Sequence, residues 1–235
     1  MNELRTALGL LTILPVRSDG QVSGRAFAFY PLVGAAMGIV LVGARLLFRL
    51  GLPELVTAAL VVVLWVVLTG ALHLDGFADS CDALFSSTTR ERRLEILHDV
   101  HLGSFGAVGL ILLLMTKFAS VASLSALAPL FLAPVLGRWA MVYAAAYPPA
   151  RAEGMAVMFR AGLTRRVILA ATIFAAGCAL VCGVFGLAAI AAAFLVATAL
   201  ARFALGRVGG LTGDIYGMIC ESVELSVLIL GMVIT

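Results

Sequence analysis

Several long apolar runs limit this chain more strongly than any other feature of its sequence. A transmembrane α-helix needs about 20 apolar residues, and only helices or closed barrels satisfy every backbone amide inside a bilayer. The runs cover residues 29–48, 53–72, 105–127, 130–147, 167–182, 185–205 and 218–234. We therefore expect an all-α, polytopic helical bundle with about seven transmembrane helices, or six if the short fifth run or the last one does not cross.

The overall composition favours the same class. Hydrophobic residues make up 63% of the 235 and charged residues 12%, whereas a soluble domain has about 25% charged residues. The net charge is only +3 and the arginines are scattered, so no nucleic-acid partner is expected. The four cysteines form no CxxC pair, which gives no sign of a disulfide framework or a zinc site.

Arginines are concentrated in alternate connections between the runs. The connections 74–104, 148–166 and 206–217 contain eight of them, and Arg5, Arg17 and Arg25 precede the first run. All fall on one side of the membrane if seven helices cross it. Because short cytoplasmic loops are enriched in Lys and Arg, we expect this side to face the cytoplasm.

Three aspartates follow the second apolar run, in the stretch HLDGFADSCDALF. Asp75, Asp79 and Asp82 are spaced i, i+4 and i+7, which places them within about 60° of one another around a helix. Like charges at this spacing repel, and desolvation near a bilayer adds to the cost. A divalent cation such as Mg²⁺, which binds carboxylates together with substrate phosphates, would relieve the repulsion. The alternative is a solvated helix face outside the membrane.

A second acidic cluster lies in GGLTGDIYGMICESVE. Asp214, Glu221 and Glu224 would lie within about 80° of one another on a continuous helix. Carboxylates inside an apolar segment are functional by default. Three glycines in the same stretch allow a close backbone approach to phosphate, although membrane helices also use glycine for packing: Gly209, Gly210 and Gly213.

The two acidic clusters lie on the same predicted side of the membrane. Together they could hold two Mg²⁺ ions roughly 4 Å apart, an arrangement that catalyses phosphoryl displacement. Lys117 and Arg138 lie inside apolar runs, where an unpaired charge is costly. We expect them to contact phosphate oxygens or to form structural ion pairs with the carboxylates.

The stretch RERRLEILHDVHLGSFGAVG joins the two halves of the predicted site. Its ExxH spacing at Glu95 and His98 has no second copy in the chain, which argues against a di-iron site. His98, Asp99 and His101 fit a lid or a hydrogen-bonding wall better than a zinc site, because the chain has only three histidines.

Four stretches of the chain resemble the cobalamin synthase family: HLDGFADSCDALF, RRLEILHDVHLGSFG, GRW and GGLTGDIYGMICESVE. The resemblance extends from Leu14 to the C-terminus, and the HLDGxADxxD pattern is specific. Two positions depart from it. Ala83 stands where the family commonly has glycine, and His101 stands where it commonly has arginine, so the guanidinium group that could contact phosphate at that position is absent.

The resemblance implies a membrane adenosylcobinamide-GDP ribazoletransferase of the bacterial cytoplasmic membrane. In that reaction a ribose hydroxyl of α-ribazole, or of its 5′-phosphate, attacks the phosphorus next to cobinamide in adenosylcobinamide-GDP, and GMP leaves. Magnesium is the implied cofactor. The partners are then these small molecules and the lipid bilayer, and a homo-oligomer is left open.

The resemblance also implies roles for individual residues within a single catalytic domain, 1–235. This domain would begin with an amphipathic segment, 1–27, and contain a cytoplasmic acidic-motif loop, 73–104. Either all of Asp75, Asp79 and Asp82 bind magnesium, or two bind it while the third accepts the hydroxyl proton. Asp214 and Glu221 are the second ligand pair, and Glu224 is a ligand or a partner of Arg138. The remaining candidates for substrate or phosphate contacts are His73, Asp99, His101, Lys117, Arg138, Gly209, Gly210 and Gly213.

Two other functions share parts of this pattern. A CDP-alcohol phosphotransferase would use the same metal and reaction on a lipid substrate. An ion-coupled transporter would place its carboxylates near the bilayer midplane, whereas the Asp75 cluster lies at the predicted end of a span and continues into a basic connection.

Overall fold

A computed structural model describes residues 2–16 and 23–234, and its regular elements are helices apart from one isolated bridge between Pro149 and Leu211. Arg17 and parts of the expected amphipathic segment 1–27 lie outside the described residues. The elements are α1 (Asn2–Leu11), η1 (Gly24–Phe29), α2 (Tyr30–Phe48), α3 (Glu54–Thr69), α4 (Leu72–Phe85), α5 (Arg90–Ile96), α6 (Ser104–Ser123), α7 (Ala128–Ala144), α8 (Met155–Arg160), α9 (Arg165–Val181), α10 (Gly183–Val208) and α11 (Gly213–Ile234).

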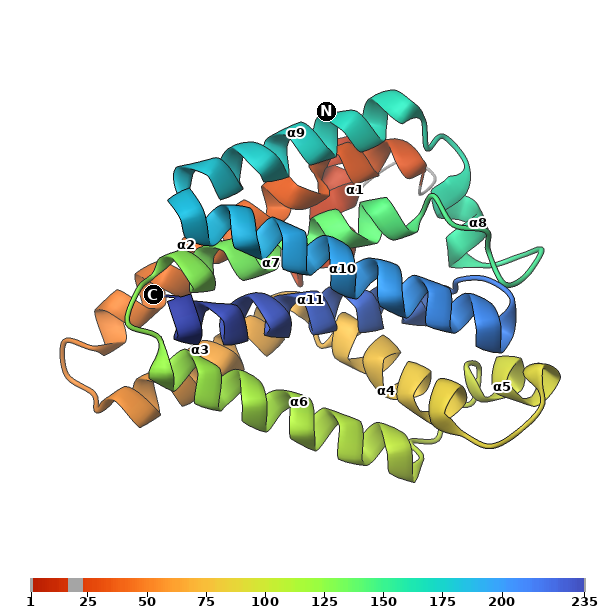
Figure 1. Ribbon diagram of the computed structural model, residues 1–235, viewed down its shortest axis with the longest axis horizontal. Helices are drawn as coiled ribbons and strands as arrows, with labels where there is room; N and C mark the ends of the chain where they lie inside the picture. Colours follow the sequence, from red (N-terminus) through yellow and green to blue (C-terminus); the bar gives the residue numbers. More distant parts are fainter. Residues whose placement is uncertain (1, 17–22, 235) are drawn as a thin grey trace.

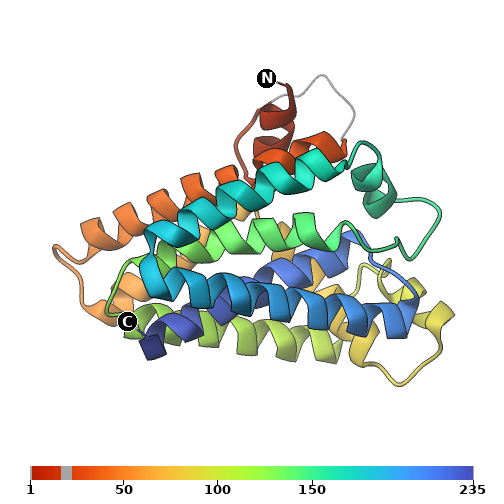
Figure 2. The same cartoon turned by 45° about the horizontal axis from the view of Figure 1, so that its top comes forward.

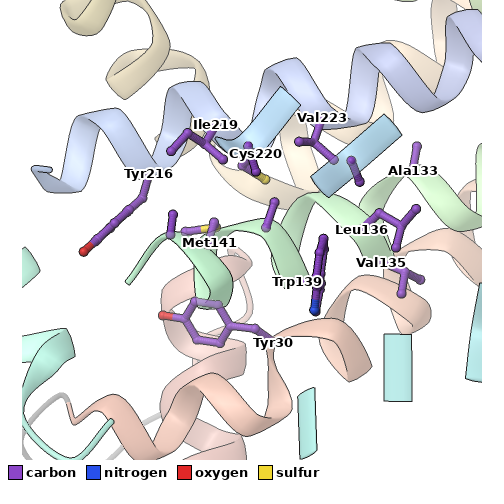
Figure 3. Packing of buried hydrophobic residues seen from close by; sticks show 14 of the residues in the cluster. Tyr30, Ala133, Val135, Leu136, Trp139, Met141, Tyr216, Ile219, Cys220 and Val223 are labelled. Carbon is purple, nitrogen blue, oxygen red and sulfur yellow. The ribbon is translucent and has the colours of Figure 1, made fainter. Parts of the chain in front are cut away.

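The long helices lie side by side in a bundle with α11 near its centre (Figure 1). Helix α11 packs against α4, α6, α7 and α10, and α7 packs in turn against α2. Residues of α2, α7 and α11 meet in the core shown in Figure 3, where Tyr30, Met141 and Ile219 are almost completely buried. Helices α9 and α10 both bury an alanine at every fourth position, and such small residues let neighbouring helices approach closely: Ala171, Ala175, Ala179, Ala189, Ala193, Ala197 and Ala201.

The structure confirms the all-α, polytopic membrane class but supports fewer full spans than the expected seven. Within the described residues, four helices are long and apolar enough to cross a membrane alone, and α3 with α4 makes a fifth candidate if this bent pair counts as one span. Each expected run does lie on a helix, but α3, α7 and α9 have only 16 or 17 residues. At 1.5 Å per residue such a helix is about 25 Å long, which is shorter than the roughly 30 Å hydrocarbon core.

A sharp break separates α3 from α4 and directs the acidic motif into the bundle. Gly70 and Ala71 both have φ of 59°, and the axes of the two helices differ by 90°. The left-handed conformation is common for glycine but costs energy at an alanine. Because of this break, α4 does not continue along the axis of α3 but packs along α11 and α6.

The connections separate into two ends of the bundle. The α4–α6, α7–α9 and α10–α11 connections lie at one end, whereas the α2–α3, α6–α7 and α9–α10 connections lie at the other (Figures 1 and 2). The first end carries the arginine-rich segments identified from the sequence. At the second end Arg45, which is 1% exposed, donates hydrogen bonds to Glu54 Oε1 at 2.6 Å and to the Leu124 carbonyl at 2.8 Å.

Candidate active site

The three aspartates of α4 differ in exposure and in contacts. Asp75 is exposed, Asp79 is half-buried and Asp82 is buried. Both carboxylate oxygens of Asp82 accept backbone hydrogen bonds, at 2.8 Å from the Gly103 amide and 2.9 Å from the Gly106 amide. These amides belong to the N-terminus of α6, where free N–H groups need acceptors and a negative charge is favourable. Asp82 therefore caps α6, with one backbone amide hydrogen bond to each of its carboxylate oxygens.

Asp75 and Asp79 instead lie near the start of α11. The helices touch at Gly76, where an added Cβ atom would lie 2.8 Å from the Asp214 Cα atom. Asp79 is within electrostatic range of both Asp75 and Asp214. In the part of the chain that the structure describes, none of these three aspartates forms a salt bridge. Contact between α4 and α11 thus gathers three negative charges, none of which forms a salt bridge with a described residue, although Arg151 lies within electrostatic range of Asp214.

A loop and helix cap fix the position of Asp214. Thr212 Oγ1 accepts a hydrogen bond from the Ile215 amide at 3.4 Å, as an N-cap residue does, and donates one to Asp214 Oδ2 at 3.2 Å. The loop before it is held by the bridge between Pro149 and Leu211. Thr212 and this loop therefore anchor Asp214 at the first turn of α11.

A polar cavity of about 200 Å³ opens beside Asp214, at the arginine-rich end of the bundle. Apolar residues make up much of its wall, and we call it the polar cavity because it also contains the side chains of His98, Arg151, Glu153, Thr212 and Asp214. The Arg151 guanidinium donates to the Leu94 carbonyl and contacts the His98 ring, which fixes it against α5. Partial burial lowers the pKa of Arg151, and the negative charge of Asp214 opposes that effect. The cavity therefore combines a cation with a carboxylate and helix N-terminal amides.

A second cavity, of about 160 Å³, lies on the other side of Asp214. Its walls are mainly apolar and come from α1, α2, α4, α7, α8 and α11, with Leu10, Leu11, Tyr30, Met141 and Phe159 among them. The polar groups on its wall include His73, Asp75 and Asp214. Met155, Gly213 and Asp214 line both cavities, so the two spaces adjoin at the first turn of α11.

Glu221 and Glu224, in contrast, belong to a buried ion cluster deeper in the bundle. Lys117 Nζ donates to Glu221 Oε2 at 2.6 Å and to Glu224 Oε2 at 2.5 Å, and Arg138 donates to Glu224 Oε1. All four side chains are at most 5% exposed. Lys117 Nζ also lies 4.4 Å from the centre of the Trp65 ring. Two cations and two anions balance, which is what makes burial of these charges tolerable.

The structure therefore does not bring the six expected carboxylates together. Asp82 accepts hydrogen bonds from the first turn of α6, whereas Glu221 and Glu224 form salt bridges with Lys117 and Arg138. Among the described residues, no three His, Cys, Asp or Glu side chains are close enough to hold a metal ion by themselves. The expectation that Lys117 and Arg138 contact phosphate is replaced by its stated alternative, a structural ion pair with the carboxylates.

Two of the three glycines expected at a phosphate serve loop packing instead. Gly209 has φ of 79° and ends α10 in the left-handed conformation, with the Arg90 guanidinium against it. An added Cβ atom at Gly210 would lie 2.5 Å from the Pro149 carbonyl carbon. Only Gly213 lines the cavities.

Asp99 and His101 lie at the surface and bind each other. Asp99 Oδ1 accepts hydrogen bonds from the His101 backbone amide at 3.1 Å and from its Nδ1 atom at 2.6 Å, and this side-chain hydrogen bond lowers the pKa of Asp99. Neither residue is among those that line the two cavities. Asp99 is nevertheless close enough to Asp79 to raise the electrostatic repulsion on that carboxylate.

Sequence patterns did not single out several residues that line these cavities. Arg151 was visible only as one of many arginines in a connection, and Thr212 only as part of a glycine-rich stretch. Tyr30, Met141 and Phe159 lie in or beside apolar segments, where nothing separates a cavity wall from an ordinary core residue. Only helix packing assigns these residues to a site.

Comparison with known proteins places the whole chain in one group. The family described as cobalamin-5-phosphate synthase matches residues 3–233. The chain is 39% identical to an adenosylcobinamide-GDP ribazoletransferase of Roseiflexus sp. (strain RS-1) over 230 residues, covering 93% of this chain and 84% of the relative. It is 40% identical to the protein of that name from Pseudomonas syringae pv. syringae (strain B728a), covering 95% of this chain and 96% of the relative. No solved structure matches the chain.

Proposed function

The chain belongs to the cobalamin-5-phosphate synthase family, and on that premise we propose that it is an adenosylcobinamide-GDP ribazoletransferase of the bacterial cytoplasmic membrane. A hydroxyl oxygen of α-ribazole, or of its 5′-phosphate, bonds to the phosphorus next to cobinamide. The bond from that phosphorus to the oxygen of GMP breaks, and GMP leaves. The hydroxyl proton passes to a carboxylate at the site. The products are the cobamide, or its 5′-phosphate, and GMP.

The observation that carries this proposal is the junction of the two cavities at Asp214, with Asp75 and Asp79 beside it. A transfer between two bulky substrates needs two binding spaces that share one reacting point. The polar cavity offers Arg151 and the first-turn amides of α11 to a diphosphate, because helix N-termini and guanidinium groups both favour anions. Gly213 leaves room for that approach.

The chemistry of the donor set fits magnesium. Asp75, Asp79 and Asp214 supply hard carboxylate oxygens, and no described Lys or Arg side chain forms a salt bridge with them. Magnesium is usually held by one or two carboxylates together with waters and substrate phosphates, which agrees with a set that does not enclose an ion by itself. When bound, the metal supplies a positive charge that stabilises the negative charge developing on the transferred phosphate.

The membrane orientation follows from the charge distribution. The site lies at the end of the bundle that carries the arginine-rich connections. These connections favour the cytoplasmic side, so both substrates reach the site from the cytoplasm.

The proposal is tested with the purified, detergent-solubilised protein, adenosylcobinamide-GDP, α-ribazole and Mg²⁺, with GMP and the corrinoid product followed by mass spectrometry. The wild type should release one GMP per cobamide formed, and EDTA should stop the reaction. Asp79→Asn should abolish turnover, whereas Glu91→Gln, an exposed carboxylate on α5, should leave it unchanged. Consumption of a CDP-alcohol in place of adenosylcobinamide-GDP, or solute uptake without GMP release, would overturn the assignment.

A further inference from the structure

The apolar cavity beside Asp214 has features that go beyond holding a metal or a phosphate. Leu10 and Leu11 of α1, Tyr30 of α2, Met141 of α7 and Phe159 of α8 contribute apolar side chains to its wall. Tyr30 is 1% exposed, Met141 5% and Phe159 4%, so this part of the wall belongs to the packed interior, whereas Leu72 and Met155 on the same wall are each 45% exposed. Such a space favours a flat apolar group and disfavours a charged one.

The size of the cavity limits what it can enclose. Its volume is about 160 Å³, below the roughly 300–1,000 Å³ of pockets that enclose a whole drug-sized ligand. A corrin ring or an entire nucleotide therefore does not fit inside it, whereas one small ring system does. Guanine is a poor occupant, because its many donors and acceptors would be buried against Leu, Met and Phe without partners.

One buried polar side chain on the cavity wall, His73, lies within electrostatic range of Arg138, Glu224 and Lys117 but forms no hydrogen bond with the described residues. His73 is 2% exposed, and neither of its ring nitrogens has a hydrogen-bond partner among the described residues. A neutral imidazole has one N–H donor and one acceptor, and an unsatisfied buried donor costs about 1–3 kcal/mol. A ligand with one suitable ring nitrogen would accept a hydrogen bond from the N–H of His73 and bury its own apolar edge against the wall.

We infer that the apolar cavity lined by Tyr30, Met141 and Phe159 binds the fused aromatic base of the nucleoside that supplies the attacking hydroxyl, and that His73 donates a hydrogen bond to the one ring nitrogen not bonded to ribose. This inference rests on the proposed function. A base seated there places its ribose toward Asp75 and Asp214, which line the same cavity. The diphosphate of the other substrate then occupies the polar cavity, across Asp214.

A variant that fills the cavity tests the placement of the base. Met141→Trp adds bulk to the wall, and Met141→Phe is the milder change if the first does not fold. Either should raise the KM for α-ribazole by about tenfold or more while the KM for adenosylcobinamide-GDP stays within about twofold, because loss of fit in an apolar pocket is worth roughly 10–200-fold. Met115→Trp, at a 63% exposed position on α6, is the matched control and should change neither KM.

A pair of substrates tests the role of His73. The indole analogue of α-ribazole lacks the free ring nitrogen but keeps the shape of the base. The wild type should prefer α-ribazole by roughly tenfold in kcat/KM, the value of one buried hydrogen bond. His73→Leu should use the two nucleosides equally well, and His73→Gln, which retains a donor, should recover part of the preference. A purely structural role for His73 would lower both activities and leave the ratio unchanged.

The outcomes separate this inference from the proposed function. No GMP release by the wild type would overturn the function itself. Normal wild-type turnover, combined with Met141 variants that raise only the KM for adenosylcobinamide-GDP or neither KM, would overturn the base-binding role of the cavity. An unchanged substrate ratio in His73→Leu would overturn the hydrogen bond to the base.

Discussion

The Glu224 carboxylate forms an ion pair with the Arg138 guanidinium inside the bundle, and neither side chain is exposed to solvent. Lys117 binds the other oxygen of Glu224 and also Glu221, so four charges from α6, α7 and α11 compensate one another. This cluster joins three helices at a depth where any unbalanced charge is costly. Its role is to hold the helices that carry the site.

Removal of one charge from this cluster should be far more harmful than removal of a balanced pair. We expect Arg138→Met to lower the free energy of unfolding by about 3–5 kcal/mol, since it leaves an uncompensated buried charge. Arg138→Met combined with Glu224→Gln should recover a large part of that loss. Unfolding followed by circular dichroism in detergent measures both. Arg92→Met, which breaks an exposed pair with Glu95, is the control and should cost at most about 1 kcal/mol. Equal losses in the single and double variants would contradict the charge-balance role.

Asp79 should destabilise the protein when no metal is present. It lies half-buried within electrostatic range of Asp75 and Asp214, and carboxylates that share a site repel one another. Asp79→Asn should therefore unfold at a higher temperature than the wild type in EDTA. Magnesium should raise the Tm of the wild type, because binding to the folded state stabilises it, and should have little effect on the variant. A magnesium-dependent rise of equal size in both proteins would argue against a metal at Asp79.

Asp82 should affect stability through α6. Loss of both backbone hydrogen bonds in Asp82→Ala should cost about 1–2 kcal/mol, the usual value of a helix N-cap. Hydrogen exchange at the Gly103 and Gly106 amides should become faster. Asp75→Ala on the same helix is the matched control, because Asp75 is exposed and caps nothing, and it should leave amide exchange in α6 unchanged. Unaltered exchange in Asp82→Ala would remove the capping role.

The close approach of α4 and α11 depends on Gly76. A Cβ atom there would meet the Asp214 backbone at 2.8 and 2.9 Å, and backbone atoms cannot rotate away. We expect Gly76→Ala to separate the two helices, to cost about 1–3 kcal/mol and to lower turnover by displacing Asp214. Gly43→Ala, where nothing lies within 4 Å, should leave both stability and turnover near the wild-type values. Wild-type turnover in Gly76→Ala would show that this contact does not position the site.

The orientation can be measured by cysteine labelling in intact cells. In a background without the four native cysteines, Leu50→Cys marks the α2–α3 end and Ala152→Cys marks the arginine-rich end; both positions are exposed. A membrane-impermeant maleimide should label Leu50→Cys in intact cells and should label Ala152→Cys only after lysis. The opposite pattern would place the site outside the cytoplasm.

The class of the fold could be predicted from the sequence because it depends on local patterns. Apolar runs near the length of a bilayer span, a low charged fraction and the HLDGFADSCDALF motif are all readable along the chain. The spacing of Asp75 and Asp79 predicted one helix face, and the structure keeps them together near Asp214. The number of full spans was harder to predict from the sequence. Helix α7 is almost entirely enclosed by protein, so its length need not equal the thickness of the bilayer.

The sequence by itself determined that this is a helical membrane protein with two acidic segments and several intramembrane charges. Only the tertiary structure decided how those charges are divided. Asp82 binds the N-terminus of α6, Glu221 and Glu224 bind Lys117 and Arg138, and Asp75 and Asp214 line a cavity with Asp79 within electrostatic range of both. The reason is that a carboxylate binds whichever cation, amide or ligand the packing places against it. That neighbour comes from a helix distant in sequence, so spacing along the chain cannot reveal it.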